Sequence, residues 1–303
     1  MIDILVILAT LVGLLVGGHY FVLGASAIGR RCGMSPVLVG ATIVAVGTSL
    51  PEWAVSVDAA LRGLEGISVG NVVGSNVCNM GIVLGLAALV MPLKASRPIV
   101  FRDGLTMLVA TAMLLWVAHD GHISRADGVL LLVGAAVAVG MFIYTGRSDP
   151  DVQRVRFHWW EVPRALAALA LVLVSSSYFV HAAESLSLSF GISPWVIGIT
   201  IAAIGTSLPE LVTSLAAAAQ GQSEMILGNV LGSSTMNIFW VLGSAAAIRP
   251  MNTSEFAAID GGLLAGLMLI SVGLLATQLR VTRWEGGLLL ACGLGWYVAQ
   301  AAI

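Results

Sequence analysis

Long apolar stretches separated by short polar segments make up most of the chain, a pattern typical of membrane-spanning helices. A helix of about 20 apolar residues is long enough to cross a bilayer. Ten stretches approach this length, near 3–29, 36–61, 67–92, 104–119, 127–145, 163–189, 194–219, 225–248, 256–278 and 284–302. The longest polar segment, 146–162, leaves no room for a soluble domain. The pattern therefore predicts an all-α integral membrane protein with five helices on each side of a short loop.

Composition agrees with a membrane protein. Hydrophobic residues make up 58% of the chain and charged residues 10%, against about 25% charged residues in ordinary soluble domains. The net charge of −2 gives no indication of a nucleic-acid partner. The three cysteines, Cys32, Cys78 and Cys292, are too widely spaced for a zinc motif or a disulfide framework. The apolar N-terminus lacks a basic region before it, so we interpret it as a retained helix rather than a signal peptide.

The basic residues predict the orientation in the membrane, because cytoplasmic loops are enriched in Lys and Arg. One set of loops carries Arg30, Arg31, Lys94, Arg97, Arg102, Arg147, Arg154, Arg156, Arg164, Arg280 and Arg283. The opposite side carries only Arg62, Arg125 and Arg249. We expect a multi-pass protein of the plasma (inner) membrane, with loop 146–162 cytoplasmic and both termini extracytoplasmic.

One segment occurs twice. Residues 40–85 match residues 198–243 at a constant offset of 158, with 23 of 46 positions identical, including all of GTSLPE. The second copy lies five spans further along the chain, an odd number, so it crosses the membrane in the opposite direction. This arrangement is the inverted-repeat plan of secondary transporters, which bind substrate near the bilayer midplane. Duplication within a purely structural bundle is the alternative, and it leaves the repeated charges unexplained.

Each copy places a proline and a glutamate in the middle of an apolar stretch. Pro51 should break its helix near Gly47 to Leu50 and free carbonyls near Ala45 and Val46, which a cation could bind. Thr48 or Ser49 should cap the following half-helix, and Glu52 then lies in its first turn, where the helix dipole favours the ionised form. The second copy repeats these features at Ala203, Thr206, Ser207, Pro209 and Glu210.

The next span adds a polar stripe. Asn71, Ser75 and Asn79 recur every four residues, and Asn229, Ser233 and Asn237 repeat them. For Asn71 and Asn229, hydrogen bonding between helices is the alternative to ion binding. Carboxylate, hydroxyl, amide and carbonyl oxygens are hard ligands that suit Ca²⁺ or Na⁺. Two glutamates can neutralise one Ca²⁺ or share their charge among several Na⁺, which is what exchange at a single site requires.

The two segments resemble the α-repeats of the Ca²⁺/cation antiporter superfamily, in its sodium/calcium exchanger branch of the prokaryotic type without a regulatory domain. The match consists of GTSLPE with GNVVGSN in the first copy and GTSLPE with GNVLGSS in the second. The resemblance implies ten transmembrane helices in two inverted five-helix repeats, 1–145 and 163–303, joined by the cytoplasmic loop 146–162. Helices 2, 3, 7 and 8 are then discontinuous at the centre, and segments 40–85 and 198–243 bind ions.

The resemblance also implies a set of ion ligands. They are Glu52, Glu210, Thr48, Ser49, Thr206, Ser207, Ser75, Ser233, Asn79 and Asn237, with the backbone carbonyls of Ala45 and Ala203. Some exchangers carry aspartate where Asn237 stands, so this chain has one ionisable ligand fewer. In that family the first and sixth helices are thought to slide across the rest.

The expected function is a secondary antiporter that exchanges Na⁺ for Ca²⁺ by alternating access, with the ions as transported ligands and no cofactor. Coupling to H⁺ or K⁺ in the same fold stays open, and a passive cation channel is a further alternative. A membrane enzyme is not expected, because the chain has neither HExxH nor GxSxG. The predicted partners are the transported ions and the lipid bilayer, without nucleic acid, and one monomer can form the site.

Overall fold

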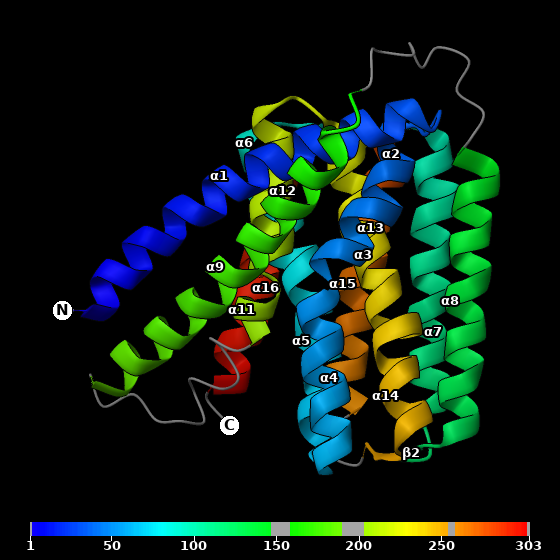
Figure 1. The fold of residues 1–303 in the computed structure, drawn as a ribbon. Helices are drawn as coiled ribbons and strands as arrows, with labels where there is room; N and C mark the ends of the chain where they lie inside the picture. The colour runs from blue at the N-terminus through cyan, green and yellow to red at the C-terminus, as the bar shows by residue number, and fades with distance from the viewer. Residues whose placement is uncertain (1, 147–157, 190–202, 254–257, 302–303) are drawn as a thin grey trace.

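Helices form nearly all of the regular structure in the computed structural model, which describes residues 2–146, 158–189, 203–253 and 258–301 (Figure 1). The first half contains α1 (Ile2–Arg31), α2 (Pro36–Val39), η1 (Gly40–Val44), α3 (Ala45–Thr48), α4 (Leu50–Arg62), α5 (Glu65–Val77), η2 (Cys78–Val83), α6 (Leu84–Val90), β1 (Leu93–Lys94), η3 (Ile99–Gly104), α7 (Leu105–Val117), β2 (His122–Ile123) and α8 (Arg125–Gly146). The second half contains α9 (Glu161–Ser189), α11 (Ala203–Thr206), α12 (Leu208–Ala219), α13 (Ser223–Met236), η5 (Asn237–Leu242), α14 (Gly243–Ile248), β3 (Met251–Asn252), α15 (Ala258–Gln278), β4 (Arg280–Val281) and α16 (Arg283–Ala301). The η elements are π-helical stretches within longer helices.

Helices with the length and apolarity of a membrane span occur in both halves of the chain. Among the described residues, seven helices are long and apolar enough to cross a membrane, or eight if the bent pair Pro36–Thr48 and Leu50–Arg62 forms one span. These helices coincide with eight of the predicted spans. The predicted span 194–219 lies partly outside the described residues, with α11 and α12 as its described part, and the span 284–302 coincides with α16. The all-α membrane architecture is confirmed at this level, and the total of ten spans stays a prediction.

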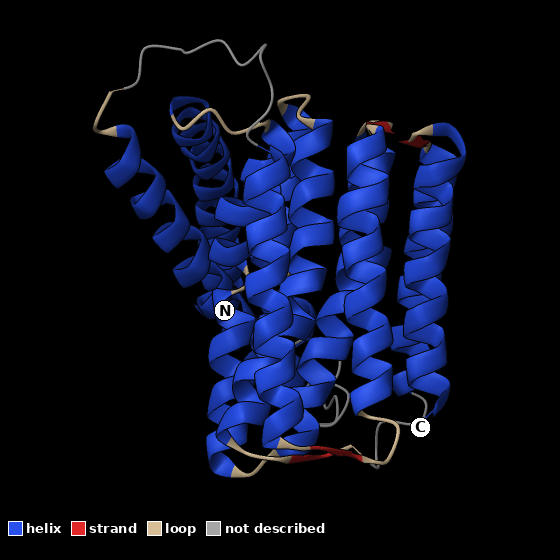
Figure 2. Ribbon diagram, turned by 90° about the vertical axis from the view of Figure 1, so that its right-hand side faces the viewer, coloured by secondary structure: helices blue, strands red, loops and turns tan. Residues whose placement is uncertain are grey.

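The sequence offset of 158 extends to elements outside the 46-residue repeat. The strand β1 at 93–94 corresponds to β3 at 251–252, and β2 at 122–123 corresponds to β4 at 280–281. The two strand pairs are antiparallel, β1 with β4 and β2 with β3, so each joins one half of the chain to the other. Figure 2 places them at opposite ends of the helices.

Two helices expected to be discontinuous are continuous. Residues Glu65–Val90 and Ser223–Ile248 each form one helix of 26 residues, so the predicted breaks in helices 3 and 8 are wrong. Neither helix contains proline, so no residue lacks the backbone donor that the helix needs. Each instead contains a π-helical stretch, η2 or η5. Such stretches are frequent at functional sites.

The breaks expected at the two Pro–Glu pairs are present. A single residue, Ser49, separates α3 from α4, and the two parts of this span meet at 43°. Ser207 likewise separates α11 from α12. Figure 1 shows α3 and α4 one above the other.

Helices α1 and α9 lie side by side and are tilted away from the upright helices (Figure 1). Glycines allow their close contact, because a Cβ at Gly17 would lie 2.8 Å from Val172 and a Cβ at Gly24 would lie 2.6 Å from Ala165. Close approach through small residues is a common basis for helix association in membranes. The two helices therefore form a closely packed pair.

Backbones also meet where α13 crosses α2 and η1. A Cβ at Gly228 would lie 2.3 Å from the carbonyl oxygen of Val37. We expect Gly228→Ala to lower the stability by about 1–3 kcal/mol, since a backbone must shift to relieve the overlap. The matched control is Gly140→Ala, where the new methyl group would meet no atom within 4 Å. Thermal unfolding in detergent, followed by size-exclusion chromatography, measures both variants, and an unchanged unfolding temperature for Gly228→Ala would refute the packing argument.

Candidate cation-binding site

The two helix breaks bring the repeated glutamates to the buried centre of the protein. Glu52 and Glu210 lie in the first turns of α4 and α12, as expected, and neither is exposed. Pro51 and Pro209 occupy the second helical positions, where the missing backbone donor costs no helical hydrogen bond. Ser49 does precede α4, but its side chain makes no capping hydrogen bond, so the predicted capping role is wrong.

The serines at the breaks instead bind the glutamates of the opposite half. The Ser49 hydroxyl donates to Glu210 Oε1 at 3.0 Å, and the Ser207 hydroxyl donates to Glu52 Oε1 at 3.3 Å. The Ser49 hydroxyl is therefore oriented toward the opposite half rather than toward the backbone of α4. Each carboxylate thus depends on the break in the other half for its position.

The hydroxyl groups around the two glutamates are arranged differently. Near Glu210, the Ser49 hydroxyl donates to Oε1, whereas Thr48 donates to the Val44 carbonyl and Ser233 donates to the Ala45 carbonyl and to Asn229 Oδ1. Their counterparts beside Glu52 behave otherwise, because Ser75 and Thr206 lie 3.4 Å apart and Thr206 donates to Asn71 Oδ1 at 3.2 Å. The Ser207 hydroxyl hydrogen-bonds to the Glu52 carboxylate, as the Ser49 hydroxyl does to that of Glu210.

The carbonyl of Ala45 is not left without a partner, contrary to expectation. It accepts hydrogen bonds from the Ser49 backbone at 3.0 Å and from the Ser233 hydroxyl at 3.5 Å. A proline has no backbone N–H, so the carbonyl four residues earlier loses its helical hydrogen-bond partner. That carbonyl belongs to Gly47 in the first half and to Gly205 in the second. The Gly205 carbonyl accepts a hydrogen bond from Ser176 of α9 at 2.9 Å. Ala203 begins α11, and its side chain lies outside the described part.

Asn71 and Asn229 form hydrogen bonds between helices, the role that the sequence analysis gave as the alternative to ion binding. Asn71 Nδ2 donates to the Glu52 carbonyl at 3.1 Å and to Ser56 at 2.9 Å, and Asn229 Nδ2 donates to Ser214 at 3.1 Å. Ser56 and Ser214 were absent from the predicted site, although both fall at matching positions of the repeat. The pairs fix the helix that carries each glutamate against the helix that follows it.

Several buried polar atoms at the centre have no hydrogen-bond partner within the described residues. They are Oε2 of both glutamates and both amide atoms of Asn79 and Asn237. All four side chains are fully buried. Buried polar atoms ordinarily find partners, and an exception at a functional site points to a bound ion or water. Oxygen atoms of this kind suit Na⁺ and Ca²⁺.

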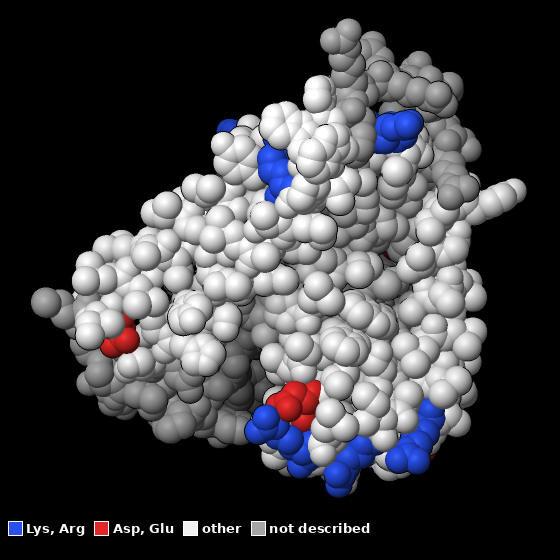
Figure 3. Space-filling view, in the orientation of Figure 1, with Lys and Arg blue, Asp and Glu red and all other residues white. Residues whose placement is uncertain are grey.

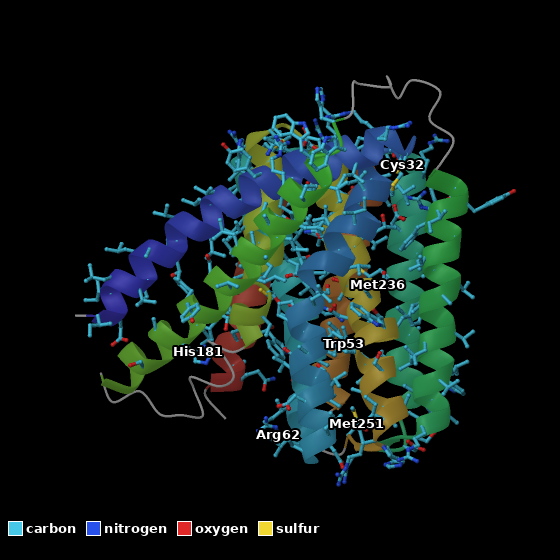
Figure 4. All side chains as sticks on the ribbon, in the orientation of Figure 1. Cys32, Trp53, Arg62, His181, Met236 and Met251 are labelled. Carbon is cyan, nitrogen blue, oxygen red and sulfur yellow. The ribbon has the colours of Figure 1, made fainter. Side chains whose placement is uncertain are left out.

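The site lies between the two ends of the bundle. Figure 4 shows Trp53, which follows Glu52, and Met236, which precedes Asn237, between an end marked by Cys32 and an end marked by Arg62 and Met251. On the face shown in Figure 3, most charged atoms gather at the ends of the helices. Arg62 pairs with Asp58 at 2.8 Å, and both side chains are more than half exposed, so this ion pair lies at the surface. Within the described ranges, no three His, Cys, Asp or Glu side chains form a metal-binding group.

Apolar helices around a polar, doubly acidic centre define an all-helical, multi-pass membrane protein. The family model described as "Sodium/calcium exchanger protein" matches residues 2–144 and 163–299. Sodium/calcium exchanger MaX1 of Methanosarcina acetivorans is 31% identical over 334 residues, covering 95% of each chain. Inner membrane protein YrbG of Escherichia coli is 35% identical over 242 residues, covering 76% of this chain and 74% of its own.

Comparison with solved structures supports the same family assignment. A structure of the sodium-calcium exchanger NCX_Mj superimposes with a TM-score of 0.88 and 32% sequence identity, covering 99% of this chain and 98% of that one. The chain belongs to the sodium/calcium exchanger family, whose members are transporters rather than enzymes. The family resemblance inferred from the two repeated motifs is confirmed.

Proposed function

We propose that the protein is a secondary antiporter that exchanges Na⁺ for Ca²⁺ by alternating access, with both ions bound at Glu52 and Glu210. The observation that carries this proposal is the pair of buried carboxylates, each held through Oε1 by a serine of the opposite half while Oε2 has no partner among the described residues. A carboxylate fixed on one side and open on the other suits cation binding.

The neutral ligands complete the proposed site. Ser75, Ser233, Asn79, Asn237, Thr48 and Thr206 would add oxygens, together with the carbonyls of Ala45 and Ala203. Two carboxylates balance the charge of one Ca²⁺ or of two Na⁺, so occupancy by one species excludes the other. This mutual exclusion couples the two fluxes.

The proposed membrane arrangement has ten helices in two inverted repeats, 1–145 and 163–303, with loop 146–162 cytoplasmic and both termini outside. The strand pairs at opposite ends of the molecule support it, because they recur at the same offset of 158 as the ion-binding segments. Crossed bonds between the halves are also what two antiparallel half-sites would form. We further propose that the closely packed α1–α9 pair slides as a unit to alternate access.

The coupling prediction is tested with purified protein in lipid vesicles. We expect Ca²⁺ uptake into Na⁺-loaded vesicles to require an outward Na⁺ gradient and to fall to background when Na⁺ is equal on both sides. Ca²⁺ flux of the same size without a Na⁺ gradient would contradict the proposed exchange.

The same vesicles distinguish the alternatives. A pH gradient without Na⁺ tests H⁺ coupling, and added K⁺ tests K⁺ dependence. Flux that does not saturate with Ca²⁺ concentration indicates a channel, since a site that binds and releases one load per cycle must saturate.

A further inference from the structure

Two tryptophans stack on each other next to residues of the proposed ion site. The ring centroids of Trp53 and Trp240 lie 5.9 Å apart, and the ring planes are 12° from parallel. Trp53 follows Glu52 in α4, and Trp240 lies three residues after Asn237 in η5. The stack therefore joins the half-helix that carries one proposed ligand to the π-helical stretch that carries another.

The contact is made by the faces of the two rings. Nε1 of Trp53 is buried and has no hydrogen-bond partner among the described residues. Stacked aromatic rings at this distance attract each other more than the area they bury accounts for. Phenylalanine at position 53 would keep a ring there and remove no hydrogen bond within the described part of the chain, so it is the conservative replacement.

The π-helical stretch η5 is held on two sides by consecutive aromatic residues. Trp240 contacts α4 through Trp53, and Phe239 contacts α8, where a Cβ at Gly134 would lie 2.9 Å from its ring. π-Helices are rare compared with α-helices, so packing has to favour the π-helical form. Relaxation of η5 to an α-helix would turn Asn237 relative to the residues that follow it. The two aromatic contacts oppose that rotation.

The half-helix α4 is also held on two sides. Asn71 of α5 donates to the Glu52 carbonyl at 3.1 Å and to the Ser56 hydroxyl at 2.9 Å, which fixes α4 against α5. The tryptophan stack fixes α4 against η5. The position of Glu52 relative to Asn237 therefore depends on the stack, because the bonds of Asn71 do not reach η5.

The sequence repeat does not duplicate this pair. Leu211 stands at the position that corresponds to Trp53, and Ile82 stands at the position that corresponds to Trp240. Aliphatic side chains have no ring faces to stack. The chain itself thus supplies substitutions that remove the stack and keep an apolar residue at each position.

We propose that Trp53 and Trp240 are positioning residues for ion binding, whose stack holds α4 against η5 so that Glu52 and Asn237 bind the same ion. This inference rests on the proposed function, and each tryptophan acts through the ligand near it in the chain. When the stack is lost, only a fraction of the protein keeps the two ligands together, and the apparent affinity falls by that fraction. The maximal rate should change less than the affinity, since both carboxylates remain.

The transport experiment compares wild type with Trp53→Leu and Trp240→Ile. We expect each substitution to raise the KM for Ca²⁺ in Na⁺-dependent uptake by about three- to tenfold, the range that the loss of one aromatic pair predicts. Trp53→Phe and Trp240→Phe keep both rings and should return KM to within about twofold of wild type. The matched control is Trp284→Leu, which removes a tryptophan that is 88% exposed and should leave KM unchanged.

A double variant tests whether the two rings act as one unit. Each single substitution already removes the stack, so Trp53→Leu combined with Trp240→Ile should raise KM no further than the more severe single substitution does. If the two effects multiply instead, the residues act independently, and the proposal is wrong.

Equilibrium binding separates this proposal from the exchange proposal. Isothermal titration calorimetry of purified protein with Ca²⁺ needs no Na⁺ gradient, and the Kd should rise by the same factor as KM. A wild-type protein that binds no Ca²⁺ would refute the proposed function and this inference with it. If wild type binds Ca²⁺ and Trp53→Leu and Trp240→Ile bind it with the same Kd, the positioning role alone is overturned, even when both variants unfold at a lower temperature. Trp53→Met and Trp240→Met, whose flexible side chains fill irregular gaps, replace the first two variants if those do not fold.

Discussion

Replacing Glu210 with glutamine is expected to lower Na⁺-dependent Ca²⁺ uptake by at least about 100-fold. The substitution leaves one carboxylate against the two charges of Ca²⁺, and removing one charged partner from a buried pair costs about 3–5 kcal/mol. Glutamine keeps the volume of the side chain, and its Oε1 can still accept from Ser49. The loss should therefore be one of ion binding, with folding retained. Glu52→Gln should behave in the same way.

The control for charge is Asp58→Asn in α4, which lies in an exposed ion pair. Uptake by this variant should stay within about twofold of wild type, since exposed pairs contribute little. Folding is checked by a single symmetric peak in size-exclusion chromatography. A folded Glu210→Gln protein with wild-type uptake would show that this carboxylate does not bind the transported ion.

The helix breaks were predictable from the sequence because a proline or a charge within an apolar stretch is energetically unfavourable. A proline within an apolar stretch has few structural outcomes, and the repeated Pro51 and Pro209 mark breaks at Ser49 and Ser207. The repeat also marked the halves whose elements later proved to recur at an offset of 158. Glu52 and Glu210 were found for the same reason, because a charge in an apolar setting needs a partner.

The hydrogen-bond partners were not predictable to the same degree. Sequence reasoning treated each half separately, so it assigned Ser49 to the nearest backbone rather than to Glu210 in the other half. It likewise left the Ala45 carbonyl without a partner, although Ser233 of α13 supplies a hydroxyl. Contacts between residues 161 or 188 positions apart depend on how the helices pack, which a local pattern does not contain.

The hydrogen bonds of the two half-sites differ, and the sequence repeat did not predict this difference. Identical residues at Thr48 and Thr206 predict equal roles, yet Thr48 donates to the Val44 carbonyl of its own span, whereas Thr206 donates to Asn71 Oδ1 and lies 3.4 Å from the Ser75 hydroxyl. Two half-sites related by an inverted repeat need not be equivalent at any one moment. In an alternating-access cycle they would exchange these arrangements as the site opens to one side and then to the other.

Removing the crossed serines should have the second-largest effect on transport. We expect Ser49→Ala to raise the KM for Ca²⁺ by about tenfold or more, because a hydrogen bond to a charged group contributes about 1.5–3 kcal/mol and the hydroxyl oxygen is also a proposed ion ligand. Ser207→Ala should raise it by a similar factor. The maximal rate should fall less than the apparent affinity, since both carboxylates remain.

The matched control is Ser271→Ala. Ser271 is equally buried, but among the described residues its hydroxyl bonds only to the Leu267 carbonyl within its own helix, at 2.8 Å. Initial rates of Na⁺-dependent Ca²⁺ uptake over a range of Ca²⁺ concentrations give KM for all three variants. Because Ser49 and Ser207 contact different glutamates, their effects on KM should multiply in the double variant. If the double variant has a KM no higher than that of either single variant, the two serines act on one carboxylate. That result would contradict the crossed arrangement.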